Sequence, residues 1–213
     1  MLKLKIIIGS IREGRSADLV APWVIDRAKN HGAFEVEVLD LVEWKLPLFA
    51  ETVQSLGDPA DPSYSTPVVK GWNERIKDGD VYLFVTPEYN YSIPGVLKNA
   101  IDTVWRSDGF RNKPAATVGY SMGVAAGVRA VQALGQIAIE AEMVPLRNAV
   151  VIPSVLTAFD GLAPHDPVTE VCLRIALDDL AWWGSALKVA RAGGELKPGV
   201  PRIREAMMAA GTL

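Results

Sequence analysis

Two short polar stretches, each following an apolar run, carry the residue types that bind small ligands. The first includes Pro87, Glu88, Tyr89 and Asn90, between a hydrophobic strand pattern and an amphipathic helical pattern. The proline stiffens the exit from the strand, the tyrosine offers an aromatic wall, and the asparagine amide both donates and accepts hydrogen bonds. A flat heteroaromatic ligand suits such a wall, although the same spacing also describes an ordinary turn between a strand and a helix.

The second stretch, GSIREGRS at 9–16, is a candidate phosphate loop. Glycines let the backbone bend close to an anion, and the helix that follows presents free N–H groups. The hydroxyl and guanidinium donors are Ser10, Arg12, Arg15 and Ser16. The stretch nearly matches a nucleotide-triphosphate loop, but Arg15 replaces the required lysine. Asp40 could serve as the acidic residue of a dinucleotide site, but the three glycines of that motif are absent. Two arginines and two serines suit a terminal monophosphate better.

A third stretch, GYSMG at 119–123, matches the nucleophile elbow of serine hydrolases and follows a predicted strand. The order Ser121, Asp160, His165 reproduces the order of a hydrolase triad. However, only four residues separate Asp160 from His165, whereas a triad normally places its acid and its base on loops after different strands. The hydrolase interpretation also leaves the other two stretches without a role. If the stretch is not a nucleophile elbow, it forms a third wall of the ligand site, and its serine hydroxyl and backbone N–H groups can meet a polar ring edge.

An alternation of strands and helices must position these stretches. The strands are expected at about 3–8, 34–39, 80–86, 115–120 and 149–152. The helices are expected at about 16–30, 67–77, from Ser92 as N-cap onward, 123–142 and 168–190. This pattern predicts an α/β fold with a doubly wound, five-stranded parallel sheet and helices on both faces. A phosphate loop after the first strand favours the flavodoxin-like order 2-1-3-4-5, in which the loops after strands one and three meet.

The remaining segments are assigned from length and composition. We expect a single domain over 1–213, with a core at about 3–190 and a tail at 191–213 that contains a possible short helix. The stretch 42–67 has four prolines, and loops of this length are often functional covers. Trp182 and Trp183 are expected to be core or interface anchors. Lys98 and Asp102, one helical turn apart, are expected to form a surface pair.

Bulk composition excludes several classes of function. A net charge of -3 without a Lys/Arg cluster argues against nucleic-acid binding. The apolar run at the N-terminus is too short for a signal peptide, and no stretch approaches a membrane span. One cysteine excludes an intramolecular disulfide, and two histidines argue against a histidine-rich metal site. A cytoplasmic protein that borrows any redox chemistry from an organic cofactor is the resulting expectation.

With these stretches placed, the chain resembles the NADPH-dependent FMN reductase family over about residues 3–190. The matching motifs are GSIREGRS, LPLF at 46–49, TPEYNYSIPGVLKNAID, AFDG at 158–161 and LDDLAWWGSAL at 177–187. By this resemblance the fold is flavodoxin-like, and the FMN phosphate is held by Ser10, Arg12, Arg15 and Ser16. The isoalloxazine ring lies along Pro87, Glu88, Tyr89 and Asn90, and its other side is bordered by Ser121, Met122 and Gly123.

The resemblance also implies an activity. NADPH or NADH passes hydride to FMN N5, and a small acceptor then takes the electrons in a ping-pong cycle. Quinones, free flavins, azo dyes, nitroaromatics and metal oxyanions such as chromate are the expected acceptors. No side chain is expected to act as a nucleophile, acid or base, and no metal is required. We expect the backbone of Glu88 to matter more than its carboxylate, because a reduced, anionic flavin would repel that charge.

The family forms homodimers, and some members form homotetramers. The alanine-rich helix predicted at 123–142 and the tryptophan pair are the candidate interfaces. An alternative function is a flavodoxin-like electron carrier with FMN but without NADPH activity. Such carriers tend to be strongly acidic, whereas the net charge here is only -3. A third alternative is a pocket that has lost FMN and binds another ligand.

Overall fold

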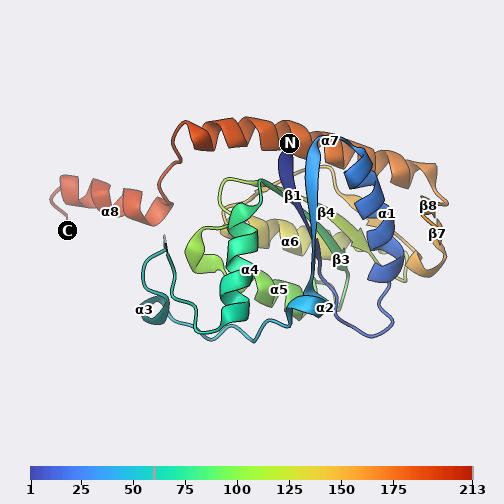
Figure 1. The fold of residues 1–213 in the computed structure, drawn as a ribbon, viewed down its shortest axis with the longest axis horizontal. Helices are drawn as coiled ribbons and strands as arrows, with labels where there is room; N and C mark the ends of the chain where they lie inside the picture. The colour runs from blue at the N-terminus through green and yellow to red at the C-terminus, as the bar shows by residue number, and fades with distance from the viewer. Residues whose placement is uncertain (60, 213) are drawn as a thin grey trace.

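Parallel strands covered by helices on both faces form the middle layer of the structure (Figure 1). The computed structural model describes residues 1–59 and 61–212, so Ala60 in the predicted cover loop and Leu213 at the end of the predicted tail lie outside it. The strands of the main sheet are β1 (Leu2–Ile8), β2 (Phe34–Asp40), β3 (Val81–Pro87), β4 (Pro114–Tyr120), β5 (Val144–Pro145) and β6 (Val150–Ile152). Their order is β2-β1-β3-β4, with β5 and β6 both paired to β4. The predicted flavodoxin-like order is therefore confirmed.

The fifth position of the sheet is divided between two short pieces. Val144 and Pro145 in β5 pair with the beginning of β4, and β6 pairs with its end, where Val118 faces Val150. The N–H groups of Val144 and Leu146 donate to the carbonyls of Lys113 and Ala115, and Pro145 between them has no N–H to offer on the outer side of the strand. The predicted strand at 149–152 corresponds to β6, and β5 was not predicted.

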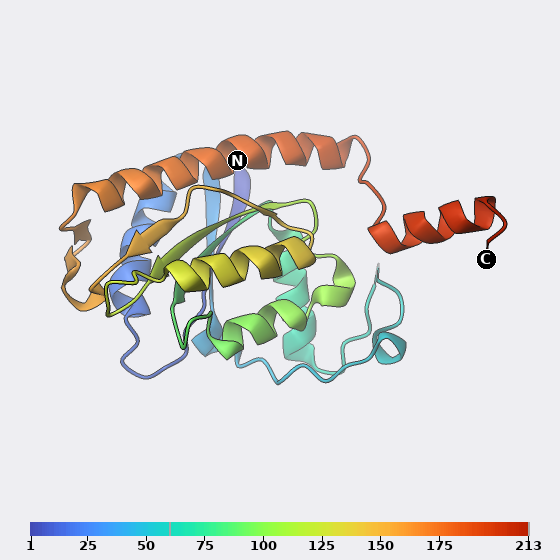
Figure 2. The same cartoon turned by 180° about the vertical axis from the view of Figure 1, so that it is seen from behind.

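Helices of two groups cover the sheet, as the two views show (Figures 1 and 2). The helices are α1 (Ala17–Asn30), α2 (Leu41–Trp44), α3 (Val53–Leu56), α4 (Pro67–Asp78), α5 (Gly95–Asp102), α6 (Val128–Glu140), α7 (Pro167–Ala192) and α8 (Gly199–Ala209). Short 3₁₀ turns lie at Trp105–Ser107 and Val155–Thr157, and a hairpin is formed by β7 (Phe159–Asp160) and β8 (Ala163–Pro164). One apolar cluster packs α1 and α7 on the sheet, and a second packs α4, α5 and α6 on the opposite face.

The two central strands explain why both clusters form. Every residue of β3 and β4 is buried, as expected for parallel strands with both faces covered. Side chains alternate along β3, so Leu83 and Val85 enter the cluster under α1 and α7, while Tyr82 and Phe84 enter the other. Burial of each such side chain contributes about 1.5–3 kcal/mol, so the central strands hold both helical layers.

The helix predicted from residue 123 begins at Val128 instead, and the backbone explains the difference. Ala126 and Gly127 have φ angles of 57° and 85°, which no α-helix accommodates. A Cβ on Gly127 would lie 2.3 Å from the backbone nitrogen of Tyr120. Only glycine allows this close approach of α6 to the end of β4. Residues 121–127 therefore form a loop at the sheet edge.

The prediction that Trp182 and Trp183 are core residues is wrong. Their exposed fractions are 66% and 40%, and their rings contact each other, with centroids 5.1 Å apart. The alternative role as interface anchors stays a prediction. Other expectations for this layer are confirmed: Lys98 donates to Asp102 at 2.7 Å on the surface of α5, and α8 is the predicted short helix of the tail. In the described part of the chain, no helix is long and apolar enough to cross a membrane.

A substitution at Gly184 tests how closely α7 packs on the sheet. A Cβ at this position would lie 2.4 Å from Val81 Cγ1 and 2.8 Å from Leu2 Cδ1, both in the core. Gly184→Ala is expected to lower the free energy of unfolding by about 1–3 kcal/mol, because the core must shift to admit the methyl group. Gly71→Ala in α4 is the matched control. The nearest atom there is 3.7 Å away, so we expect a gain of about 0.5–1 kcal/mol from helix propensity. Urea unfolding measures both; equal effects of the two substitutions would contradict the packing described.

Candidate functional site

Three loops gather at one edge of the sheet because β1, β3 and β4 run parallel and end there. Ile8 pairs with Val85, and Pro87 pairs with Tyr120, so the strands end at nearly the same level. The residues that follow them are Gly9, Glu88 and Ser121, which begin the three stretches singled out in the sequence. Ligands of open parallel sheets bind at this carboxyl edge.

The loop after β3 is a tight turn. Tyr89 and Ser92 exchange backbone hydrogen bonds of 2.9 and 3.0 Å, and Asn90 and Tyr91 between them have φ angles of 48° and 70°. Two consecutive left-handed residues define a type I′ turn. Ser92 therefore closes this turn. It does not cap the helix, so the prediction of Ser92 as N-cap is wrong: α5 begins at Gly95, after Pro94. The turn presents Asn90 and Tyr91 to solvent.

The phosphate-loop candidate lies against this turn. The hydroxyl oxygens of Ser10 and Tyr89 are 2.8 Å apart, and either can donate. The guanidinium of Arg12 lies 5.7 Å from the centroid of the Tyr89 ring, at cation–π distance. The first and second polar stretches therefore do adjoin in space. Arg12 is exposed at the rim, and Ser10 is fully buried beneath it.

Arg15, a predicted phosphate ligand, is engaged within the protein. Its Nη1 donates to Asp40 Oδ1 and to the carbonyl of Ser10, each at 2.6 Å, and its Nη2 donates to Asp40 Oδ2 at 2.5 Å. Its Nε donates to Asp18 at 2.9 Å. Asp40 is thus the partner of Arg15 at the end of β2. These bonds fold the loop back onto the sheet, so the structure shows Arg15 shaping the loop.

The charge of Arg15 controls the ionisation of Asp40. Burial alone would raise the pKa of this carboxyl group, but hydrogen bonds from Arg15 and from the N–H of Val42, together with the positive charge of Arg15, outweigh it. The pKa of Asp40 is therefore below its ordinary value, and the carboxylate stays charged at neutral pH. The pair keeps the shape of the loop independent of pH over the neutral range.

Glu88 forms the connection between the turn and the third loop. Its carboxylate accepts from the Arg129 side chain at 2.8 Å and from the Arg129 backbone N–H at 3.1 Å, and its side chain is only 8% exposed. Arg129 lies in the first turn of α6, where an anion is stabilised by the helix dipole. The Arg129 guanidinium also lies 3.9 Å from the ring centroid of Tyr91. Arg129 therefore contacts both the residue before the turn and one of its two central residues.

The sequence analysis missed Arg129. The available signal was a cation just after the glycine-containing loop that begins the helix. The expectation that the Glu88 backbone matters more than its carboxylate stays a prediction; the structure shows that carboxylate bound to Arg129. The backbone N–H of Glu88 is also engaged, since it donates to the carbonyl of Tyr120 at 3.0 Å.

The loop after β4 is held by the neighbouring strand. The Ser121 N–H donates to Ile152 O at 3.1 Å, and the Ser121 hydroxyl donates to Gly123 O at 2.9 Å. Asp160 and His165 lie in and just after the β7–β8 hairpin and are exposed. Among the described residues, no hydrogen bond joins the side chains of Ser121, Asp160 and His165. The structure thus gives the hydrolase interpretation no support.

Tyr120 is a second site residue that the sequence analysis missed. Its ring is 1% exposed, and its hydroxyl is buried with no hydrogen-bond partner within the part of the chain that the structure describes. Burial raises the pKa of this phenol above its ordinary value, and Tyr89, Arg15 and Arg12 are close enough to act on it electrostatically. A buried hydroxyl without a partner is costly, which favours a ligand atom as its partner.

Asn99 of α5 extends the site toward the stretch LPLF at 46–49. Its Oδ1 accepts from the Phe49 N–H at 2.8 Å, and its Nδ2 donates to Pro47 O at 2.9 Å. The segment after β2 is therefore attached to the same helix that follows the tight turn. In residues 1–59 and 61–212, no group of three or more His, Cys, Asp or Glu side chains could hold a metal ion.

Comparison with known proteins identifies the family. The model of the NADPH-dependent FMN reductase family matches residues 2–157. An NAD(P)H-dependent FMN reductase of Pseudomonas aeruginosa is 42% identical over 192 residues, which cover 88% of this chain and 97% of that protein. A quinone reductase of Pseudomonas putida is 31% identical over 84% of this chain and 92% of its own length. The chain spans 57% of an NAD(P)H-dependent FMN reductase of Schizosaccharomyces pombe, with 33% identity.

Solved structures support the same fold. FerB, an NAD(P)H:(acceptor) oxidoreductase flavoenzyme of Paracoccus denitrificans, superposes with a TM-score of 0.69 at 24% identity, covering 87% of this chain and 98% of FerB. RosB with a bound riboflavin-5′-phosphate derivative gives a TM-score of 0.74 at 10% identity, covering 99% of this chain and 88% of RosB. The chain belongs to the NADPH-dependent FMN reductase family. The predicted oxidoreductase class, with FMN and NAD(P)H as the cofactors of the family, is confirmed.

The pair Glu88–Arg129 can be tested by a double-mutant cycle. Glu88→Gln and Arg129→Gln should each lower the free energy of unfolding by about 1–2 kcal/mol, because a buried, charge-assisted bond is lost. The double substitution should cost less than the two single effects together, with a coupling of about 1 kcal/mol or more. The exposed pair Lys98–Asp102 is the control, for which we expect a coupling below about 0.5 kcal/mol. Chemical unfolding measures both cycles, and equal couplings would show that Glu88 is not held as described.

Proposed function

We propose that this chain is an FMN-dependent oxidoreductase that transfers electrons from NADPH or NADH to a small acceptor in a ping-pong cycle. FMN, when bound, supplies the chemistry: it accepts hydride at N5 from the nicotinamide and returns the electrons to the acceptor. The observation that supports this proposal most directly is the contact between Ser10 and Tyr89, which places a phosphate loop beside an aromatic turn at the sheet edge. A flavin mononucleotide has both parts, a terminal phosphate and a flat ring.

The hydrogen-bond donors at the phosphate end of the site suit a phosphate group. Ser10, Arg12 and Ser16 would hold the phosphate at the N-terminus of α1, where backbone N–H groups and the helix dipole favour an anion. Arg15 would support these residues through Asp40 and through the carbonyl of Ser10. The unpartnered hydroxyl of Tyr120 would donate to the same group, which accounts for its burial.

The ring end fits the other two loops. Pro87, Glu88, Tyr89 and Asn90 would lie along one side of the isoalloxazine, and Ser121, Met122 and Gly123 would border the other. Arg129 neutralises the Glu88 carboxylate, so no free negative charge opposes a reduced flavin. No side chain of this site is assigned as nucleophile, acid or base; the chain's part is to bind, orient and leave one ring face open.

The acceptors follow from the relatives and from the open site. The Pseudomonas putida relative is named a quinone reductase, which favours quinones. Free flavins, azo dyes, nitroaromatics and metal oxyanions such as chromate are further acceptors that we propose. We also propose a homodimer or a homotetramer as the working assembly.

Absorption spectroscopy tests the function. The protein is purified without added flavin, its visible spectrum is recorded, and NADPH and then a quinone are added without oxygen. We expect a yellow protein that NADPH bleaches and the quinone recolours. A yellow protein that NADPH leaves unchanged would show an electron carrier instead. Protein that stays colourless after FMN is supplied would overturn the flavin assignment.

Tyrosine hydroxyls at the two ends of the sheet give a matched pair of variants. Tyr120→Phe should weaken FMN binding about tenfold, which corresponds to about 1.4 kcal/mol, and should leave the stability of the flavin-free protein nearly unchanged. Tyr82→Phe should instead lower the stability of the flavin-free protein and leave FMN binding unchanged. The hydroxyl of Tyr82 donates to Ile76 O at 2.6 Å far from the loops, so its loss should cost about 1 kcal/mol of stability without affecting FMN. Flavin fluorescence titration and urea unfolding measure the two effects; an unchanged FMN affinity in Tyr120→Phe would remove Tyr120 from the site.

A further inference from the structure

The C-terminal helix α8 projects away from the body of the molecule (Figures 1 and 2). None of its side chains is buried. Val200, Ile203 and Met207 nevertheless form an apolar stripe at spacing i, i+3, i+7, with exposed fractions of 71%, 61% and 39%. Such a stripe normally faces a hydrophobic partner. The body of the same chain does not cover it.

The surface area of the chain indicates how large the missing contact is. The accessible surface is 11084 Å². A compact monomer of 23.0 kDa is expected to expose about 9,600 Å². The excess of about 1,500 Å² exceeds the area of roughly 800 Å² that each partner buries in a stable protein–protein interface. The chain therefore carries enough unburied surface for a dimer.

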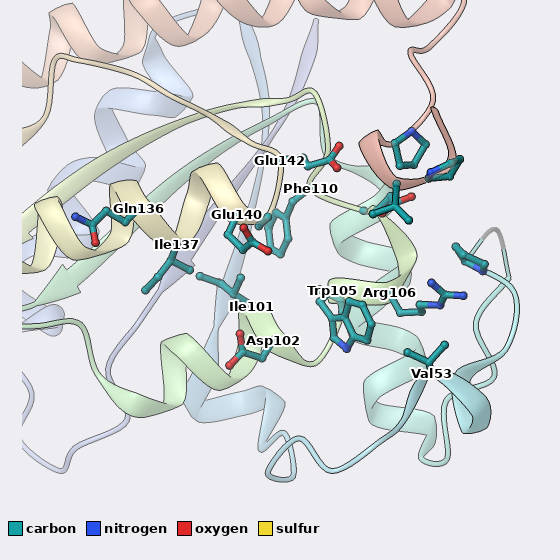
Figure 3. Close-up of a pocket in the computed structure, with 18 of the residues that line it drawn as sticks. Val53, Ile101, Asp102, Trp105, Arg106, Phe110, Gln136, Ile137, Glu140 and Glu142 are labelled. Carbon is teal, nitrogen blue, oxygen red and sulfur yellow. The ribbon is translucent and has the colours of Figure 1, made fainter. Parts of the chain in front are cut away.

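A cavity of about 1020 Å³ lies between α8 and the C-terminal parts of α5 and α6 (Figure 3). Ile101, Trp105 and Ile137 line it from the body, and Val200 and Met208 line it from α8. Trp105 is 44% exposed beside it. An 11-residue helix about 10 Å wide and 1.5 Å per residue long occupies roughly 1,300 Å³. The cavity thus has nearly the size of α8 itself.

Charged residues of both signs line the cavity, and one acid of the body and one base of α8 among them matter for what could fill it. Glu140 of α6 contributes a carboxylate and Arg204 of α8 a guanidinium. Within residues 1–59 and 61–212, neither forms an ion pair, although both line the same space. A second α8 placed between them would bring its own Arg204 to Glu140, and a twofold axis would repeat the contact in the other direction.

We propose that α8 is an exchanged arm. In a twofold dimer, the α8 helix of one copy occupies the cavity between α8 and the α5–α6 surface of the other copy. The apolar stripe is then buried against Trp105 and Ile137, and Arg204 pairs with Glu140 across the interface. The proposal depends on surface, volume and charge, so it does not depend on the flavin assignment.

Self-association of the full chain is the first test. Ile203→Glu and Met207→Glu place a carboxylate in the stripe, and Ala209→Glu places one on the opposite side of α8 as the control. Light scattering and sedimentation are measured over a range of concentrations, with circular dichroism as the check of folding. We expect the stripe variants to raise the dissociation constant of the dimer at least 100-fold, and the control to assemble like the unchanged chain. A chain that is monomeric at 100 µM, or stripe variants that assemble normally, would overturn the proposal.

Cross-linking between different copies is the second test. In a Cys172→Ser background, chains with Met208→Cys are mixed with chains with Gln136→Cys, treated with a short bis-maleimide and examined by peptide mass spectrometry. The proposal requires a product that joins residue 208 of one copy to residue 136 of the other. Absence of that product in a dimeric sample would overturn the exchange. Binding of α8 to anionic phospholipid vesicles by a protein that remains monomeric would also overturn it, and would assign the stripe to a membrane surface.

Discussion

The candidate site depends on one constraint, the parallel direction of β1, β3 and β4. Because these strands end at the same edge, residues 79 positions apart in the sequence reach hydrogen-bond distance, as Ser10 and Tyr89 do at 2.8 Å. Hydrogen bonds such as those of Arg15 and Glu88 then fix the shape of the loops. Their positions come from the fully buried strands below them, and the two apolar clusters hold those strands in place.

The N-termini of α1 and α6 both follow loops at this edge, and they are used differently. The first turn of α6 already holds the carboxylate of Glu88, which accepts from the backbone and the side chain of Arg129. In the first turn of α1, Asp18 accepts from Arg15, but among the described residues no carboxylate accepts from the backbone N–H groups of this helix end. Since a helix N-terminus favours negative charge, these free N–H groups support the proposed phosphate position at α1, while the Glu88 carboxylate is already neutralised by Arg129.

The sequence predicted those parts of the molecule that follow from local patterns. Strand order, the position of the three loops and the pairing of Lys98 with Asp102 follow from hydrophobic periodicity and short spacing. The ion pairs Glu88–Arg129 and Arg15–Asp40 join residues that are 41 and 25 positions apart, and no local pattern specifies them. The late start of α6 depends on contact between Gly127 and Tyr120, and the exposed Trp182 and Trp183 lie on a helix that is apolar on more than one side. Tertiary contacts decided each of these cases.

Both edges of the sheet are unsuited to receiving another strand. At one edge, β2 carries Glu35 and Glu37, and Glu37 forms an ion pair with Lys5 of the neighbouring strand. The other edge consists of two short pieces, β5 and β6, and Pro145 in β5 has no backbone N–H to donate to a further strand. Charged, short or proline-containing edges disfavour the stacking of strands from different molecules into cross-β fibrils. In this protein, growth of the sheet into fibrils is therefore blocked at both sides, and ordered association is left to the helices.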